Sequence, residues 1–172
     1  MEEVVSEDQI IMQVREFQLS YEEYASDREL SKTDAELLRL AREVTAQAYA
    51  PYSHFRVGAA ARLQNGVIIT GTNQENASFP AGICAERTLL SVAGAQYPGV
   101  AIGTLAISYH NENGVSDTPI SPCGICRQSL QEFEQRTGKP VRLVLGGETG
   151  KVIVLERSAL LLPFAFSADE LK

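Results

Sequence analysis

The chain has 172 residues, of which 44% are hydrophobic and 22% charged, with a formal net charge of -7 and a pI of about 4.9. This length and composition are typical of one globular domain with a substantial core. The negative charge argues against a polynucleotide partner, because the phosphate backbone attracts basic protein surfaces.

The sequence also argues against a membrane or secreted protein. No apolar run approaches the roughly 20 residues of a membrane helix, and the acidic start Met1-Glu2-Glu3 differs from the basic and then apolar layout of a signal peptide. The three cysteines, with one Cys-x-x-Cys pair, favour thiolate chemistry in a reducing compartment over a disulfide framework. We therefore expect a cytoplasmic protein without membrane or nucleic-acid partners.

The first 31 residues are acidic and only locally patterned. Apolar residues alternate there with polar ones at the spacing of a half-buried strand, in two short sets: Ile10, Met12 and Val14, then Phe17, Leu19 and Tyr21. The pattern predicts an edge strand within an N-terminal extension over residues 1–31, followed by one domain over residues 32–172.

A helix is predicted to begin at Thr33. Thr33 and Glu36 have the spacing of a capping box, in which a hydroxyl and a carboxylate satisfy free amides of the first helical turn. An apolar stripe follows at spacings of three and four residues, formed by Leu37, Leu40, Ala41, Val44 and Ala48. This helix should pack one face on a sheet and end before Pro51.

The remaining elements alternate between strands and helices. Strands over residues 55–62 and 67–72 flank Asn65-Gly66, which favours a tight hairpin turn. Further along we predict a helix over residues 84–94, a strand over 100–109, a polar loop over 111–121, a helix opened by the second cysteine pair, and strands over 141–145 and 152–155. This order predicts a three-layer α/β/α domain with a mixed sheet.

All three cysteines stand at two predicted helix starts, in Cys84-Ala85-Glu86 and in Cys123-Gly124-Ile125-Cys126. Free amides and the positive end of the helix dipole favour thiolates there. Three protein ligands leave the fourth tetrahedral position of Zn²⁺ for water, which is the arrangement of a catalytic site. Glu86 is suited to take a proton from that water, and Arg87 is suited to offset thiolate charge by hydrogen bonding from outside the ligand set.

Other sites also contain a Cys-x-x-Cys pair, namely redox pairs and structural zinc sites. A structural zinc site needs a fourth ligand, and the two histidines, His54 and His110, lack ligand spacing. A redox pair leaves Cys84 and Glu86 without a role. Cys-x-Glu followed by Pro-Cys-x-x-Cys matches the signature of the zinc nucleobase deaminases, so the sequence favours zinc-dependent deamination.

Five blocks of sequence carry a wider resemblance: AYAPYSHFRVGAA at residues 48–60, NQENASFP at 73–80, GICAERT at 82–88, SPCGICRQ at 121–128 and LLP at 161–163. In these blocks, from about residue 37 to 171, the chain resembles the cytidine deaminase family in its small homotetrameric form. The resemblance implies a cytidine deaminase-like fold and hydrolysis of cytidine and deoxycytidine to uridine and deoxyuridine with release of ammonia, in pyrimidine salvage.

The resemblance also implies roles for individual residues. One zinc ion per subunit would be bound by Cys84, Cys123 and Cys126, with Glu86 as the proton shuttle. The substrate-binding positions would be Phe55 against the pyrimidine, Asn73 and Glu75 at the ribose, Ala85, and Phe166 reaching into a neighbouring subunit's site. An amide and a carboxylate suit sugar hydroxyls, and an aromatic face suits an uncharged base. We therefore expect a homotetramer with shared active sites.

Several positions remain open. Without the cysteine blocks, Phe55 would fit a core strand, and Asn73 and Glu75 a solvated loop. Phe164 lies two residues before Phe166 and is a second match to the phenylalanine of the family. Phe79 stands where the family usually has tyrosine, and the lost hydroxyl would alter how the ribose is held.

Two other functions also remain open. One is a deaminase of a related base or nucleoside antibiotic such as blasticidin S. The other is a non-catalytic zinc-binding protein, which would have no use for the carboxyl of Glu86. The loop at residues 111–114 and the first thirty residues are longer than the resemblance leads one to expect.

Overall fold

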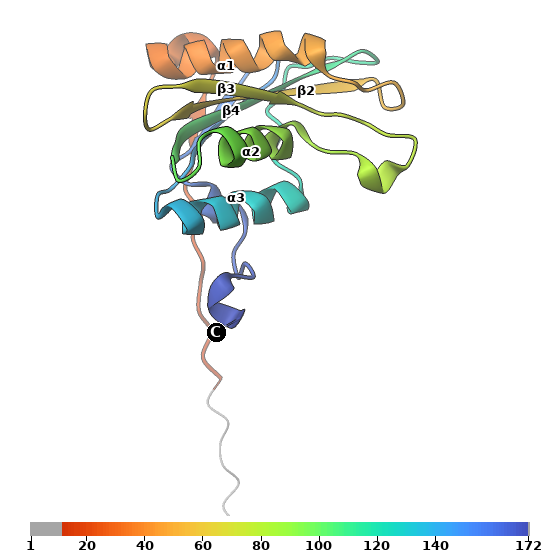
Figure 1. The fold of residues 1–172 in the computed structure, drawn as a ribbon. Coiled ribbons are helices and arrows are strands. Elements are labelled where there is room, and N and C mark those ends of the chain that lie inside the picture. Colours follow the sequence, from red (N-terminus) through yellow and green to blue (C-terminus); the bar gives the residue numbers. More distant parts are fainter. Residues whose placement is uncertain (1–11, 172) are drawn as a thin grey trace, which may run out of the picture.

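Residues 12–171 are described by the computed structural model, and they are built around one six-stranded sheet (Figure 1). Its strand order is β1-β6-β5-β4-β2-β3, where the strands are β1 (Glu22–Tyr24), β2 (Phe55–Leu63), β3 (Ile68–Thr72), β4 (Ile102–Asn111), β5 (Arg142–Gly146) and β6 (Val152–Leu155). β4 and β5 are parallel, and every other neighbouring pair is antiparallel. The predicted mixed sheet is confirmed.

Helices cover both faces of the sheet. Helix α1 (Lys32–Val44) lies on one face, whereas α2 (Ala85–Gln96) and α3 (Gly124–Thr137) lie on the other (Figure 1). Each face has its own apolar cluster. Successive side chains of β2 point to opposite faces, so Ala59 packs on the α2 and α3 side and Ala60 on the α1 side. The predicted three-layer α/β/α architecture is confirmed.

The hairpin between β2 and β3 follows its local sequence. Gly66 has a φ of 86°, in the left-handed region that glycine adopts without a steric penalty. The backbone N–H of Leu63 donates to Val67 O at 2.8 Å, and that of Gly66 donates to Leu63 O at 2.9 Å. The predicted Asn-Gly turn is confirmed.

The predicted start of the first helix is corrected by two residues. Ser31, not Thr33, is the N-cap, and its hydroxyl oxygen accepts from the backbone N–H of Asp34 at 3.2 Å. Glu36 does not take part in a capping box but forms an ion pair with Arg62 of β2 at 2.8 Å. Both Ser and Thr are good caps, and it is Ser31 whose backbone lies outside the helical region, with a ψ of 152°. The helix ends before Pro51, in the 3₁₀ turn η2 (Thr45–Gln47).

The predicted N-terminal edge strand is also corrected. Residues 12–21 are not in a strand, and Ile10 lies outside the described residues. The edge strand is instead β1, which pairs with β6 through Glu22 opposite Val154. The ion pair of Glu23 with Lys151 across this edge, at 2.7 Å, accompanies the pairing. Local alternation favours a strand, but a strand also needs an open partner edge, and here β6 offers one only to residues 22–24.

Short 3₁₀ turns complete the chain, at η1 (Asp27–Glu29), η3 (Phe79–Ala81), η4 (Ser158–Leu161) and η5 (Ala168–Leu171). Leu160 and Leu161 of η4 pack against the apolar cluster under α2 and α3. Within residues 12–171, every helix is too short or too polar to cross a membrane.

Candidate functional site

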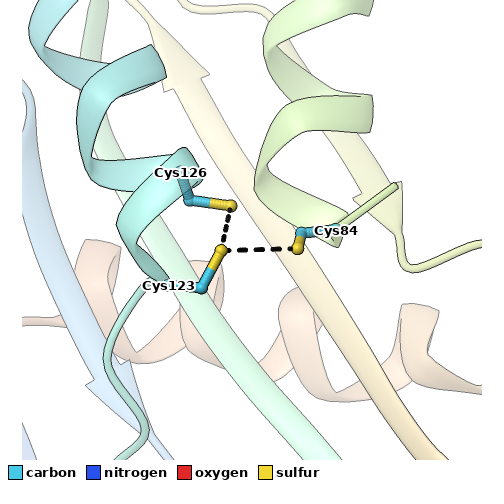
Figure 2. Close-up of side chains that lie close together, drawn as sticks. All are labelled: Cys84, Cys123 and Cys126. Carbon is cyan, nitrogen blue, oxygen red and sulfur yellow. Dashed lines mark hydrogen bonds between the residues drawn. The ribbon is translucent and has the colours of Figure 1, made fainter. Parts of the chain in front are cut away.

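Three thiols meet between the first turns of α2 and α3 (Figure 2). Cys84 is the N-cap residue of α2, Cys123 is the N-cap residue of α3, and Cys126 lies in the first turn of α3. The sulfur of Cys123 is 3.6 Å from that of Cys84 and 3.4 Å from that of Cys126. The prediction that both cysteine sites open helices is confirmed.

The spacing of the sulfurs fits a zinc ion. Two sulfurs, each about 2.3 Å from a tetrahedral zinc, are separated by roughly 3.8 Å, and all three sulfurs here lie within 4.8 Å of one another. Cys126 is buried, Cys84 is half-buried and Cys123 is exposed, so the cluster has one side open for a fourth ligand. Three thiol donors with an open position are the composition of a catalytic rather than a structural zinc site.

The surroundings favour the thiolate of Cys84. A hydrogen bond from Cys126 lowers the pKa of Cys84 to about 6, with further help from Cys123 and from the positive charge of Arg87, against the opposing effect of burial. The pKa of Cys126 is raised, chiefly because its thiol is hydrogen-bonded to Cys84 and also because it is buried. The cluster therefore already holds one negative charge that a cation can neutralise.

Glu86 lies in the first turn of α2, and only 5% of its surface is exposed. Burial raises the pKa of its carboxyl, and the nearby Cys84 raises it further, although the backbone N–H of Glu86 and the thiol of Cys126 partly offset the shift by hydrogen bonding. A carboxyl with a raised pKa is a stronger base than an ordinary carboxylate, which suits it to accept a proton. The structure thus places a buried carboxyl beside the thiols.

Close packing and two isolated β-bridges bring the loop after β3 to the thiols. A Cβ at Gly71 would lie 2.6 Å from the carbonyl oxygen of Ala85, so only glycine lets the first turn of α2 rest on β3. Gln74 pairs with Ile83, the residue before Cys84, and also with Tyr49. The segment of residues 73–75, which follows β3, is thereby fixed against the start of α2.

A cavity of about 340 Å³ opens between these segments. The residues that line it are Asn73, Gln74, Glu75, Asn76, Phe79, Gly82, Ile83 and Cys84. It joins one thiol of the cluster to both polar residues predicted to bind a sugar. A larger hollow of about 620 Å³ lies between α2 and α3, and Cys84, Cys123, Cys126 and Glu86 are not among its lining residues.

The side chains of Asn73 and Glu75 also form hydrogen bonds with the protein backbone. The side-chain oxygen of Asn73 accepts from Val57 N–H at 2.7 Å, and its amide donates to Phe55 O at 2.9 Å. Glu75 Oε2 accepts from the backbone N–H groups of Tyr52 at 2.9 Å and Ser53 at 3.3 Å. A side-chain hydrogen bond from Ser53 also reaches this carboxylate. Because an ionised carboxylate offers about four acceptor sites, it can still accept from a ligand.

Phe55 begins β2 and is half-buried. Its ring stacks on the buried Tyr109 of β4, with centroids 4.8 Å apart and an angle of 17° between the rings. Phe55 is therefore neither a fully buried core residue nor a free surface aromatic. Ala85 is the first residue of α2 and is fully buried, backbone included.

The C-terminal phenylalanines lie apart from the cavity in this chain. Phe166 is 58% exposed, and its carbonyl oxygen accepts from Gln128 of α3 at 2.8 Å. Phe164 is fully exposed and has a φ of 56°. Phe79 lines the cavity and packs edge-on against Tyr52, with centroids 5.8 Å apart.

Two residues near the site were not identified from the sequence. Tyr109 supports the ring of Phe55, and Glu112 contacts the residues on either side of Phe55. Both contacts depend on the register of β4 against β2, which pairs Phe55 with Asn111. The resemblance gave one usable signal, the unusual length of the loop that contains Glu112.

Comparisons with known proteins agree with this geometry. Residues 31–139 match the family model described as the cytidine and deoxycytidylate deaminase zinc-binding region. The chain belongs to this family. The matched span includes all three thiols of the cluster and Glu86, and the zinc-binding region of the family agrees with the fit of the thiols to a zinc ion.

Relatives match over most of their length. The cytidine deaminase of Halalkalibacterium halodurans is 38% identical over 137 residues, covering 78% of this chain and 95% of the relative. The solved structure of cytidine deaminase from Burkholderia pseudomallei superposes with a TM-score of 0.67 at 36% identity, covering 80% of this chain and 100% of that one. The predicted membership of the family and the predicted α/β fold are confirmed.

A blasticidin-S deaminase is a more distant relative. The enzyme of that name from Bacillus cereus is 30% identical over 106 residues, covering 60% of this chain and 75% of the relative. The match is shorter and weaker than those to the cytidine deaminases, so the antibiotic-deaminase alternative is not favoured.

Proposed function

We propose that this protein is a zinc-dependent enzyme that hydrolyses the amino group of cytidine and deoxycytidine, giving uridine or deoxyuridine and ammonia. The observation that carries the proposal is the placement of three thiols at zinc spacing beside a buried carboxyl and a cavity that also holds Asn73 and Glu75. The named activity of the relatives supports the same substrate.

Cys84, Cys123 and Cys126 would hold the zinc ion, one per subunit. Zinc bound there supplies a Lewis acid that lowers the pKa of a water molecule at the open side of the cluster. Arg87 offsets part of the negative charge of the three thiolates, since its positive charge already favours the thiolate of Cys84.

Glu86 moves the protons. Its carboxylate accepts a proton from the attacking water and delivers it to ring nitrogen N3 while oxygen bonds to C4 of the base. It then transfers the second proton to the exocyclic amine, the C–N bond breaks, and ammonia leaves. The raised pKa of this buried carboxyl suits both the accepting and the donating step.

The remaining site residues orient the nucleoside. The amide of Asn73 and the carboxylate of Glu75 would bind ribose hydroxyls, and the ring of Phe55 would pack on the pyrimidine. Ala85, buried at the start of α2, would complete the substrate-binding positions, since its backbone amide has no partner within the helix. Phe79, on the cavity wall, would contact the sugar without the hydroxyl that a tyrosine would provide.

The assembly and setting are further parts of the proposal. We propose a homotetramer in which the exposed side chain of Phe166 reaches the site of a neighbouring subunit, and a role in pyrimidine salvage in the cytoplasm, without nucleic-acid or membrane partners. The exposure of Phe166 and of the neighbouring Phe164 supports a contact outside the chain itself. The domain would span residues 32–172 after an extension of residues 1–31, of which β1 joins the sheet.

The test is ammonia release by purified, zinc-loaded protein given cytidine, deoxycytidine, cytosine, adenosine and blasticidin S in parallel. We expect turnover of the two nucleosides of cytosine and none of the other compounds. Turnover of blasticidin S alone would favour the antibiotic deaminase, and stoichiometric zinc without any turnover would favour a non-catalytic zinc-binding protein.

A further inference from the structure

The backbone bends sharply just before Phe55. His54 has a φ of 56°, in the left-handed region that non-glycine residues rarely adopt. Such a conformation costs about 1 kcal/mol or more and persists only where surrounding contacts hold it. The contacts that hold this bend therefore fix the direction in which Phe55 enters β2.

Glu112 supplies several of these contacts from the loop after β4. Its backbone N–H donates to His54 O at 3.0 Å, and its Oε2 lies 3.0 Å from His54 Nδ1. Its Oε1 accepts from Arg56 Nε. Glu112 thus contacts the residues on both sides of Phe55.

Arg56 connects Glu112 to a further segment of the chain, at Ala48. Its guanidinium also donates to the carbonyl oxygen of Ala48 at 3.2 Å, so Glu112 is linked to the segment that precedes the bend. The hydrogen bond from Arg56 and the one from His54 hold the pKa of Glu112 below its ordinary value. The carboxylate is therefore charged at neutral pH and acts as the centre of the cluster.

The ring of Phe55 also has a contact of its own with β4. Tyr109 of β4, three residues before Glu112 in the sequence, stacks on the ring, and its hydroxyl lies 3.4 Å from the hydroxyl of Thr118. Asn73 binds the carbonyl oxygen of Phe55 from the wall of the cavity. The end of β4 thus controls both the ring and the backbone of Phe55.

We propose that Glu112 is a positioning residue for cytosine recognition, which acts by holding the bend at His54 and Arg56 and thereby the ring of Phe55. The proposal rests on the proposed function, in which Phe55 packs on the pyrimidine. Glu112 itself does not contact the substrate in this account. Its effect should therefore fall on substrate binding and not on the chemical step.

The test compares Glu112→Ala with Glu148→Ala in the zinc-loaded, full-length protein. Glu148 provides a matched control because it pairs with the other histidine, His110, at 2.8 Å, and joins β4 to the turn between β5 and β6. For cytidine, Glu112→Ala should raise KM about fivefold, the scale of one lost aromatic contact, and leave kcat within about twofold. Glu148→Ala should change neither constant.

A second pair of variants tests whether Glu112 acts through Phe55. Glu112→Ala should raise KM in the wild-type background but add little in a Phe55→Leu background, because the ring that it positions is already gone. Glu112→Gln keeps the size of the side chain and one acceptor oxygen, so it should restore part of the affinity, and it serves as the working variant if Glu112→Ala fails to fold.

Several outcomes of these experiments would overturn the proposal. An equal rise in KM from Glu112→Ala in the wild-type and Phe55→Leu backgrounds would overturn it. A lower kcat and a lower melting temperature without a change in KM would also overturn it. If the wild-type protein turns over cytidine and Glu112→Ala has the same KM and kcat, this inference alone is overturned. A wild-type protein that leaves cytidine unchanged would overturn the proposed function as well.

Discussion

The two halves of the site are built in different ways. The zinc half consists of side chains at the starts of α2 and α3, where Cys84 and Cys123 are N-cap residues and Glu86 is buried. The proposed nucleoside half consists of strand ends and loops, where Asn73 and Glu75 are held by hydrogen bonds to the backbone of distant segments.

This difference separates chemistry from recognition. The helix starts fix the reacting groups within a few residues of sequence, and the dipole and free amides of each helix favour the thiolate state. The recognition half depends on contacts between segments that are far apart in sequence, such as Asn73 with Phe55. Substitutions in the first half should therefore reduce turnover or metal content, whereas those in the second should mainly reduce affinity.

The largest effect is expected at Glu86. Glu86→Gln should lower kcat about 10²- to 10⁴-fold, because an amide cannot shuttle a proton, while the three thiols still bind zinc. Steady-state ammonia release and zinc content by atomic emission measure the two properties on one sample. Normal turnover with zinc bound would remove the proposed role of Glu86.

The next effect is expected at Cys123. Serine is a favoured N-cap residue, so Cys123→Ser preserves the start of α3 and isolates the loss of one metal ligand. Zinc affinity should fall by more than the 10- to 100-fold typical of losing an outer partner of a ligand, and the melting temperature should fall with it. Ile125→Ser, at an exposed neighbouring position, is the control. Stoichiometric zinc after dialysis of Cys123→Ser would contradict the assignment of this ligand.

A smaller effect on turnover is expected at Asn73. Asn73→Ala removes bonds to Phe55 O and Val57 N–H and should destabilise the fold by about 1–3 kcal/mol, with a raised KM for cytidine. Asn73→Asp keeps the bond from Val57 but places a carboxylate near Phe55 O, so it should recover only part of the stability. Urea unfolding and cytidine kinetics measure both effects. A lower kcat with an unchanged KM in Asn73→Ala would contradict the assignment of Asn73 to substrate recognition.

The smallest effect concerns the pH dependence of stability through Glu75. Partial burial pushes its pKa up, but hydrogen bonds from Ser53 and from the backbone of Tyr52 and Ser53 outweigh burial and hold the pKa below the ordinary value of 4.5. A lowered pKa in the fold means that the charged carboxylate stabilises the protein above pH 4.5 and that this stability is lost as the pH falls through the folded pKa. Melting temperatures of Glu75→Gln should therefore fall less steeply than those of the wild type below pH 4.5. Parallel curves would show that Glu75 does not contribute.

The same contrast explains what the sequence predicted and what it did not. The thiols, Glu86 and their helix starts follow from spacings of a few residues, and the structure brings the three sulfurs together. Tyr109 and Glu112 reach Phe55 only through the β2–β4 register, which local patterns do not specify.

The errors in the predicted elements have a similar origin. The alternating residues before Glu22 predicted a strand, but the partner edge of β6 pairs with Glu22–Tyr24 instead. Thr33 predicted the helix cap, but Ser31 lies two residues earlier and Glu36 turns to Arg62. At the edge strand, pairing with β6 chose between two local solutions, and at the helix start two good cap residues stand two positions apart.

The most direct test of the two-part site is X-ray absorption spectroscopy of the zinc-loaded protein. The account predicts three sulfur ligands at about 2.3 Å and one oxygen or nitrogen ligand at about 2.0 Å, with the oxygen or nitrogen shell altered by added cytidine. A shell of four light atoms, or one that includes histidine nitrogens and fewer than three sulfurs, would contradict the site that Cys84, Cys123 and Cys126 are proposed to form.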